Sequence, residues 1–476
     1  MSRSVFARTR DGFPGSPALG RALAEATATL LAALATMLCA LAMAPGPGPA
    51  TLAVVLCLSL SRSQLDRDLR GRLEAAVVLP LVGVMALGVG LLLRHLPWIG
   101  AAVFVAGMFV SIWLRRFGPM AQRAGSLIAL PFVVLLTVPH LRPAANGVLP
   151  VWLVPIVVAL LALFWVTVFH LLVRWLRIRP PAEEDDLPVA APVTQDKPGL
   201  AVSTRMAIQM AVALAVAFAV GFFFFRERWG WIVLTAFIVN SGNRGRLDVV
   251  YKSGMRVLGA AAGTVFALGL GQHLGIDHRA TAALILTALF LGVWLRPFGY
   301  AWWALFVTVA LALLQGFDGG EPGGLLWQRM EEIILGALIG IAAAWFVLPV
   351  RSTDVLRRRL ADALAALSEA LDPATEGRSA VRFNAALKRV EQVAPPFRAV
   401  RLLARQRAMH PADWADTLLD CRQSACALID RGATPGRIRQ LVGAARRSLR
   451  EPETLAPTLH ELRGALREMQ AAQAPA

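Results

Sequence analysis

Two hydrophobic stretches of this chain repeat one another at an interval of 181 positions. Residues 113–118 read WLRRFG and residues 294–299 read WLRPFG, and each copy follows one apolar run and precedes another. Apolar runs at 50–57 and 231–238 are separated by the same interval. We therefore interpret the first 350 residues as one hydrophobic module that is present twice. Duplicated membrane halves are typical of transporters, in which the substrate path lies between the halves.

The composition supports a membrane protein. Hydrophobic residues make up 57% of the chain and charged residues only 17%, whereas a soluble domain carries about 25% charged residues. A helix of about 20 apolar residues crosses a bilayer, and runs of that order recur. We predict an all-α polytopic protein with about twelve spans, six in each half, near 22–44, 49–61, 73–93, 98–114, 124–139, 150–173, 206–225, 229–241, 253–272, 280–295, 300–316 and 328–349.

Basic residues gather in alternate loops between these spans. Lys and Arg are concentrated in the loops that face the cytosol if the N-terminus is cytosolic, and five arginines lie in the others. The bias predicts that both termini are cytosolic. An even number of spans in each half makes the repeat a parallel one.

Two of the predicted spans, 49–61 and 229–241, are short and end in polar runs at matching places. Short, interrupted segments at equivalent positions of two repeats point to a binding site. We therefore consider Asn240 and Asn243 candidate substrate contacts. The alternative is that both polar runs are ordinary cytosolic turns.

The remaining boundaries follow from composition. We divide the chain into a first membrane repeat (1–179), a proline-rich and acidic cytosolic linker (180–204), a second membrane repeat (205–350) and a cytosolic helical domain (351–476). The last domain has 21 basic and 14 acidic residues. That excess fits contact with anionic membrane lipid, and because acids are mixed with the bases we do not expect a nucleic-acid partner.

Charged groups inside predicted spans are costly and are functional candidates. Three carboxylates lie well inside spans: Glu25, Glu331 and Glu332. Arg329 precedes Glu332 by three positions, so the two share a helix face. A base beside carboxylates suits either the binding of an organic anion or the carriage of a proton, and we assign these four residues to coupling or gating. A structural ion pair at a helix end is the alternative.

Lys252 and Arg256 lie one helical turn apart at the cytosolic start of another span. We consider both candidates for attracting a substrate carboxylate, and Trp231 a candidate for stacking on an aromatic substrate. Membership of an interfacial aromatic belt is the alternative for Trp231. We find no phosphate loop, nucleophile elbow or His/Cys cluster with metal-ligand spacing, and therefore expect no enzyme activity, no cofactor and no metal.

The second half contains, in order, the run 229–236, Arg256 with Gly259 and Gly263, Tyr300, Arg329 with Glu331 and Glu332, Gly336, and Leu348-Pro349. In this order and spacing it resembles the fusaric acid resistance (FUSC) family of the aromatic acid exporter superfamily, which is related to plant aluminium-activated malate channels. The resemblance covers about 205–350 and extends more weakly, through the repeat, over 21–175. In the Arg-x-x-Gly-Thr-x-x-Gly pattern of the family, Ala260 stands where Thr is usual, which puts a hydroxyl role there in doubt.

The resemblance implies a secondary transporter of the bacterial inner membrane that exports aromatic carboxylic acids by using the proton gradient, often with a periplasmic adaptor of the membrane-fusion type. Arg256 and Lys252 would attract the anion, and Arg329 with the neighbouring carboxylates would act on the exit side. A passive anion channel of the malate-channel type and a non-transporting membrane scaffold remain alternatives. Homo-oligomer formation is left open.

Overall fold

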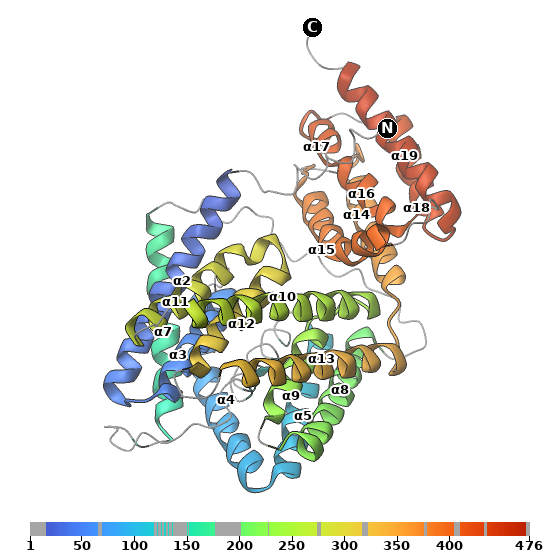
Figure 1. Ribbon diagram of the computed structural model, residues 1–476. Coiled ribbons are helices and arrows are strands. Elements are labelled where there is room, and N and C mark those ends of the chain that lie inside the picture. Colours follow the sequence, from blue (N-terminus) through green and yellow to red (C-terminus); the bar gives the residue numbers. More distant parts are fainter. Residues whose placement is uncertain are drawn as a thin grey trace. The chain divides into compact units, whose positions relative to one another are not determined.

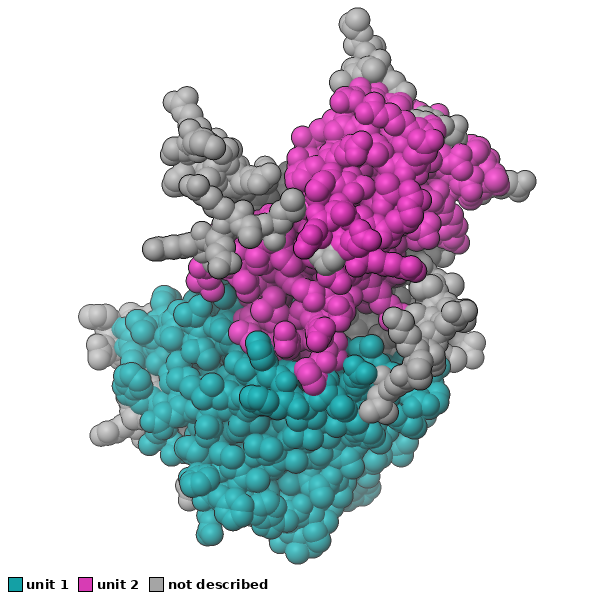
Figure 2. Space-filling view, turned by 90° about the vertical axis from the view of Figure 1, so that its right-hand side faces the viewer, with its two compact units in different colours: residues 1–181, 200–242, 252–348 teal, residues 182–199, 243–251, 349–476 magenta. Residues whose placement is uncertain are grey.

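The computed structural model of the chain describes residues 16–64, 69–118, 150–176 except 151, 201–273 except 227, 278–316, 322–375, 378–403, 410–432 and 436–472, with scattered positions between 121 and 136. These residues form helices and short turns, and no strand occurs among them. They divide into two compact units, coloured separately in Figure 2. The predicted span 124–139 lies mostly outside the described residues, as does the predicted linker except at its end, where α8 begins at Val202.

Unit 1 contains the apolar helices of both halves (Figure 1). Those of the first half are α2 (Ser16–Met43), α3 (Pro47–Gln64), α4 (Leu69–His95), α5 (Pro97–Trp113), the 3₁₀ turn η2 (Leu114–Phe117) and α7 (Val154–Trp175). Proline stands at the first position of α3 and α5, where its missing N–H is not needed. The helices α2, α3 and α7 pack against one another in pairs.

The helices of the second half are α8 (Val202–Phe224), α9 (Trp229–Asn240), α10 (Arg246–His273), α11 (His278–Leu295), the 3₁₀ turn η4 (Arg296–Phe298), α12 (Tyr300–Gly316) and α13 (Pro322–Phe346). Here α8, α9 and α13 pack against one another in pairs, as α2, α3 and α7 do in the first half. Contacts between the described residues of the two halves include those of α5 with α8 and of α11 with α2.

The repeated WLRxFG motif has the same local structure in both places. Its central residues form η2 in one copy and η4 in the other, and each turn ends at a glycine with positive φ, 104° at Gly118 and 159° at Gly299. A side chain is strained in that part of backbone space. The motif therefore encodes a tight reversal between two apolar helices.

Five helices among the described residues are long and apolar enough to cross a membrane: Ala22–Met43, Ala76–His95, Pro97–Phe117, Val154–Val173 and Val202–Phe224. Four shorter apolar helices cover Gly48–Ser61, Trp229–Asn240, Ala280–Leu295 and Tyr300–Leu313. The helices α10 and α13, at 28 and 25 residues, are as long as spanning helices but carry several charged side chains. Those charges form much of the candidate site.

Unit 2 has its own hydrophobic core, built by α14 (Ser352–Ala370), α15 (Val381–Leu403), α16 (Pro411–Asp420), α17 (Arg422–Asp430), α18 (Gly436–Ser448) and α19 (Pro452–Ala472). Residues 243–251 belong to this unit. The backbone of Arg246 donates to Val350 O at 3.0 Å, and that of Leu247 donates to Ser352 Oγ at 2.9 Å.

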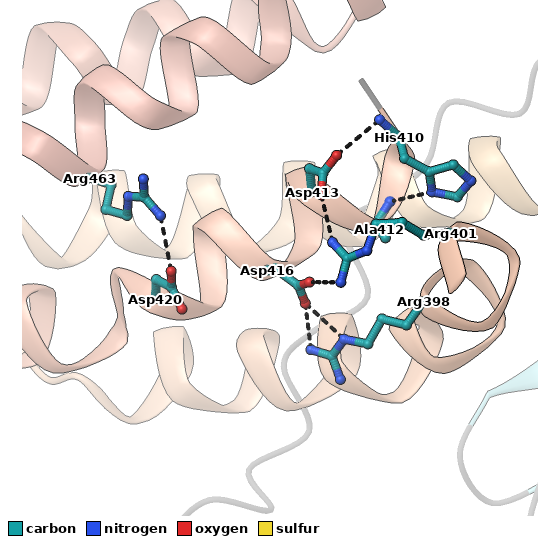
Figure 3. A network of polar contacts seen from close by, with 8 residues as sticks. All are labelled: Arg398, Arg401, His410, Ala412, Asp413, Asp416, Asp420 and Arg463. Carbon is teal, nitrogen blue, oxygen red and sulfur yellow. Dashed lines mark hydrogen bonds and ion pairs between the residues drawn. The ribbon is translucent and has the colours of Figure 1, made fainter. Parts of the chain in front are cut away.

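An ionic network joins α15 to α16 in unit 2 (Figure 3). Arg401 donates to Asp413 at 2.6 Å and reaches Asp416 at 2.8 Å, and Arg398 also binds Asp416. At the start of α16, the backbone N–H of Ala412 donates to His410 Nδ1 at 3.3 Å. The N–H of His410 donates in turn to Asp413 at 3.0 Å, which closes a capping box.

Candidate functional site

The candidate site lies along the contact between α9 and α13. Gly336 and Gly340 of α13 face α9 so closely that a Cβ at Gly336 would lie 2.6 Å from Ile232 O, and one at Gly340 would lie 2.4 Å from Val239. Small residues allow two helices to approach in this way. Residues early in α9 contact residues early in α13, and late residues contact late ones, so the two helices run parallel. The glycines therefore give α13 a thin face, on which Arg329 also lies.

Arg329 is fully inside the protein, with 3% of its surface exposed. Its guanidinium carbon stands 4.0 Å from the ring centroid of Trp231 on α9, which is a cation–π contact. The indole face compensates part of the solvation that the charge loses on burial. The sequence offered Trp231 as a substrate contact or as part of an aromatic belt, and the structure instead stacks it on an arginine.

Arg256 is the second buried arginine, with 2% of its surface exposed. It shares the face of α10 that carries Gly259 and Gly263, and these two glycines pack against Ala304, Leu305 and Thr308 of α12. Among the described residues, no hydrogen-bond partner reaches its Nε. Arg256 lies within electrostatic range of Arg329, so two guanidinium groups share one buried region.

Glu332 supplies the buried carboxylate of this region, with 1% of its surface exposed. Its Oε1 lies 3.7 Å from Nε of Arg228, which precedes α9, and the carboxylate is also within electrostatic range of Arg329. Arg228 donates to the side chain of Gln328 as well. Glu331, the neighbouring candidate, is exposed.

Neither Arg228, one of the five arginines that the charge bias assigns to outward loops, nor Gln328 is among the site residues that the sequence predicts. One signal was available, because Gln328 and Glu332 are one turn apart on α13 and present two acceptors on one face. What could not be read from the sequence is that the residue before α9 lies beside that face.

The other end of α9 carries a separate polar group. Asn240 is 3% exposed and donates to Ala236 O at 3.0 Å. Lys252 Nζ donates to Ser241 O at 3.2 Å and to Gly242 O at 3.1 Å, so the ammonium caps the carboxyl end of α9. Asn243 is buried but belongs to unit 2.

Glu25, the candidate carboxylate of the first half, is half-buried near the start of α2. Gln209 of α8 follows Glu25 by 184 positions, close to the interval of the repeat, and donates to Val347 O at 2.9 Å and to Leu348 O at 3.1 Å. It thereby satisfies the carbonyls of the two residues that follow α13, where Leu348 takes a positive φ of 45°. The second copy of this position is thus a helix cap.

The structure brings together two residues that the sequence suggested for opposite ends of the path. Arg256 was expected on the entry side and Arg329 on the exit side, yet the two lie within electrostatic range of one another. Arg256 is ten residues into α10 and Arg329 seven residues into α13, which at ~1.5 Å per residue moves both toward the middle of their helices. Arginine side chains stay charged in proteins, so among the described residues Arg228, Arg256 and Arg329 outnumber two carboxylates, buried Glu332 and exposed Glu331. An anion is the ligand that this region favours.

One comparison with known proteins gives a match, and it covers the part of the chain that contains the candidate site. Residues 204–343 match the model of the family described as fusaric acid resistance protein-like. The matched segment begins in α8 and ends in α13, and it includes both buried arginines, Trp231 and Glu332. Comparisons with curated proteins and with solved structures give no match. The segment that contains the candidate site is therefore similar to the fusaric acid resistance protein-like family.

Proposed function

We propose that this protein is a secondary transporter that exports hydrophobic organic anions, aromatic carboxylic acids among them, in exchange for protons. The family and the apolar helices support a membrane protein with a role in transport or efflux. The bacterial inner membrane is its proposed location, with both termini in the cytosol.

The observation that carries the proposal is the pairing of two buried guanidinium groups next to an indole ring. Arg256 and Arg329 are 2% and 3% exposed, and Arg329 stands over Trp231. Like charges in a low-dielectric region repel, and a bound carboxylate between them relieves that repulsion. A guanidinium binds a carboxylate in two-pronged geometry, which gives orientation as well as affinity.

We assign the roles accordingly. Arg256 and Arg329 bind the carboxylate, Trp231 orients Arg329 and offers an aromatic surface, and Glu332 competes with the substrate for the arginines. Competition of this kind links the charge of Glu332 to substrate binding, because a bound anion displaces the carboxylate from the arginines. Lys252 and Asn240 hold the cytosolic end of α9, with Asn243 and Glu25 as further polar groups on that side.

The proposed architecture is two parallel repeats of six spans, followed by a helical domain that contacts anionic lipid. The matching packing of α2, α3 and α7 and of α8, α9 and α13 supports the repeat. A periplasmic adaptor of the membrane-fusion type is the proposed protein partner, and homo-oligomer formation is compatible with this arrangement.

The test is efflux of radiolabelled 4-hydroxybenzoate from loaded cells that lack the gene, with and without a plasmid copy. We expect faster efflux with the gene, and loss of that gain on addition of a protonophore. Arg256→Gln and Arg329→Ala should each reduce the gain by on the order of tenfold or more, because each removes a charge-assisted hydrogen bond. Arg226→Gln, which changes an exposed arginine before α9, is the matched control and should leave efflux unchanged.

Each outcome selects a mechanism. Gene-dependent flux that ignores the protonophore and follows the gradient of the anion itself would favour the channel alternative. Gene-dependent flux that persists in both arginine variants would contradict the proposed site. A gene-dependent resistance phenotype that needs residues 355–476, with no gene-dependent flux, would favour the scaffold.

A further inference from the structure

One threonine of α9 has a hydroxyl group that none of the roles above uses. Thr235 is fully buried, with 0% of its surface exposed, and no hydrogen-bond partner reaches its Oγ1 among the described residues. Buried polar groups are nearly always hydrogen-bonded, so an exception in a folded protein calls for a reason.

Other helical threonines of this chain show what a buried hydroxyl does in a structural role. Thr29, Thr36 and Thr308 are 3%, 0% and 1% exposed, and each donates to the carbonyl oxygen four residues earlier at 2.7 Å. Thr235 has the same kind of acceptor four residues back, the carbonyl of Trp231, and does not bond to it. Its hydroxyl is therefore not used to hold α9 together.

The position of Thr235 places this hydroxyl at the candidate site. It lies one helical turn beyond Trp231, on the same face of α9. That face meets α13 at Gly336, where a Cβ would lie 2.8 Å from Thr235 Cβ. Gly336 follows Arg329 by seven positions, so the two share a face of α13. The hydroxyl therefore borders the same helix contact in which the Arg329 guanidinium stands over the Trp231 ring.

The helix that carries Arg256 shows the same feature. Ser253 and Thr264 share the Arg256 face of α10, are 2% and 9% exposed, and have hydroxyl oxygens that no partner reaches in the described part of the chain. Apolar packing occurs on that face as well, at Val249 and Ala260, which are fully buried. A few placed polar groups in an otherwise apolar wall are typical of sites for small molecules.

From these positions we infer that Thr235 is a substrate-binding residue that sets specificity. Its hydroxyl hydrogen-bonds to a second polar group of the anion, on the far side of an aromatic ring whose carboxylate is bound by Arg329. One helical turn rises about 5.4 Å, which is of the order of the distance across a substituted six-membered ring. A hydroxyl both donates and accepts, so it pairs with a hydroxyl group in the para position of an aromatic acid.

The physical reason for the specificity is the cost of leaving Thr235 unpaired. A site built to hydrogen-bond a substrate group discriminates strongly against the analogue that lacks this group, because its own polar atom then stays buried without a partner. This subsite rests on the anion site proposed above. It adds selection among aromatic acids that carry the same charge.

Binding is measured on the full chain, purified and reconstituted in lipid nanodiscs, by equilibrium dialysis against radiolabelled acids. The acids are benzoate, 2-hydroxybenzoate and 4-hydroxybenzoate, of which only the last carries a hydroxyl across the ring from the carboxylate. We expect the wild type to bind 4-hydroxybenzoate about tenfold more tightly than either of the others, as one hydrogen bond allows.

Three variants test the residue. Thr235→Val keeps the shape of the side chain without the hydroxyl, and should reduce the preference for 4-hydroxybenzoate over benzoate by about tenfold. Thr235→Ser restores a hydroxyl and should recover most of the preference. Thr308→Val is the matched control, because Thr308 is equally buried but its hydroxyl is bonded to Ala304 O. Its preference should equal that of the wild type.

A measurement without ligand tests the same hydroxyl independently. Replacing a buried polar group that has no partner removes its desolvation cost. Thr235→Val should therefore melt at or above the wild-type temperature when no acid is present. A clearly lower melting temperature would show that the hydroxyl has a structural bond, and would overturn the subsite.

The outcomes separate the subsite from the function on which it rests. Equal binding of the three acids by the wild type, or a preference that persists in Thr235→Val, overturns the subsite and leaves the anion site in place. Binding of none of the acids overturns both. Equal loss of preference in Thr308→Val overturns the assignment to Thr235. Should Thr235→Val fail to fold, Thr235→Ala takes its place in the binding measurement, with the same expected loss of preference.

Discussion

At the scale of single residues, the candidate site depends on how buried charges are compensated. The charge of Arg329 is compensated in part by a cation–π contact with the Trp231 ring, and the charge of Glu332 by an ion pair with Arg228. The sequence singled out Arg329, Glu332 and Trp231 because ionisable groups are rare inside spans and tryptophan is conspicuous there. Helical spacing suggested the pair of Arg329 and Glu332, which lie within electrostatic range of one another. It did not suggest their contacts with Trp231 and Arg228, because partners on different helices are set by packing and not by spacing.

Replacing Trp231 by leucine should destabilise the purified protein. The indole is lost from beneath the Arg329 guanidinium, a contact of about 0.5–2 kcal/mol, and the arginine remains buried. Trp231→Phe should lose less because an aromatic face remains. Thermal stability, measured by size-exclusion chromatography after heating, checks this. Trp302→Leu, at an indole that is 47% exposed, should match the wild type, and equal melting of all the variants would contradict the contact.

His410 should make α16 less stable in acid. Burial lowers the pKa of His410, with Arg401 adding to the decrease and Asp413 opposing it. The unfolded chain, with the ordinary pKa near 6.5, therefore binds a proton more readily than the folded one. The stabilisation is present above pH 6.5 and is lost as the pH falls through the lowered folded pKa. Protonation of Nδ1 also removes the acceptor for Ala412 N–H.

The comparison is between the wild type and His410→Asn, which keeps an N-cap acceptor without a titrating ring. Hydrogen exchange of α16, corrected for the intrinsic rate, should rise in the wild type below about pH 6.5 and stay flatter in the variant. The same acid dependence in both proteins would rule out His410 as the cause.

At the scale of elements, two glycine faces position the site. Gly336 and Gly340 let α13 approach α9, and Gly259 and Gly263 let α10 approach α12. The sequence showed both sets of glycines, because residues three or four positions apart lie on the same face of a helix. It did not show which helix each face meets. The parallel direction of α9 and α13 also follows from contacts between residues about a hundred positions apart.

Gly336→Leu should separate α13 from α9 and weaken the protein. A Cβ there would lie 2.6 Å from Ile232 O and 2.8 Å from Thr235 Cβ, and backbone cannot yield as a flexible side chain does. We expect a loss of about 1–3 kcal/mol, as for overpacked cores, and a lower melting temperature in detergent.

Gly254→Ala is the control for Gly336→Leu, because no atom lies within 4 Å of a Cβ at that helical position. It should be neutral or stabilising by about 0.5–1 kcal/mol, since alanine favours a helix over glycine. Destabilisation of equal size at both positions would show that helix packing is not the reason.

At the scale of the whole molecule, the chain consists of a membrane-type unit and a unit with its own core. The core of unit 2 is formed mainly by leucines, alanines and three large aromatic side chains, Phe383, Phe397 and Trp414, from α14 to α19. The helical spacing of those leucines was visible in the sequence. The sequence did not show that residues 243–251 belong to this unit, because their hydrogen bonds reach Val350, Ser352 and Gln392, far along the chain.

The fragment 349–476 should fold without the membrane unit. Its helices bury a continuous apolar core, and the Arg398–Arg401–Asp413–Asp416 network lies entirely within it. We expect a helical circular dichroism spectrum and a cooperative urea transition. A fragment that includes residues 243–251 through a flexible linker should be more stable than the shorter one. A spectrum without a cooperative transition would show that the core needs the rest of the chain.

The sequence by itself determined the local features of this protein. Apolar runs, loop charges and glycine spacing act over neighbouring residues, and they predict helices, a membrane environment, the family and most of the charged candidates. Only the tertiary structure decided which of these candidates share a site. Arg256 and Arg329 are 73 positions apart and were predicted for opposite ends of a path, yet they lie within electrostatic range of one another. Contacts of this kind depend on which helix faces meet, and no periodicity within one helix carries that information.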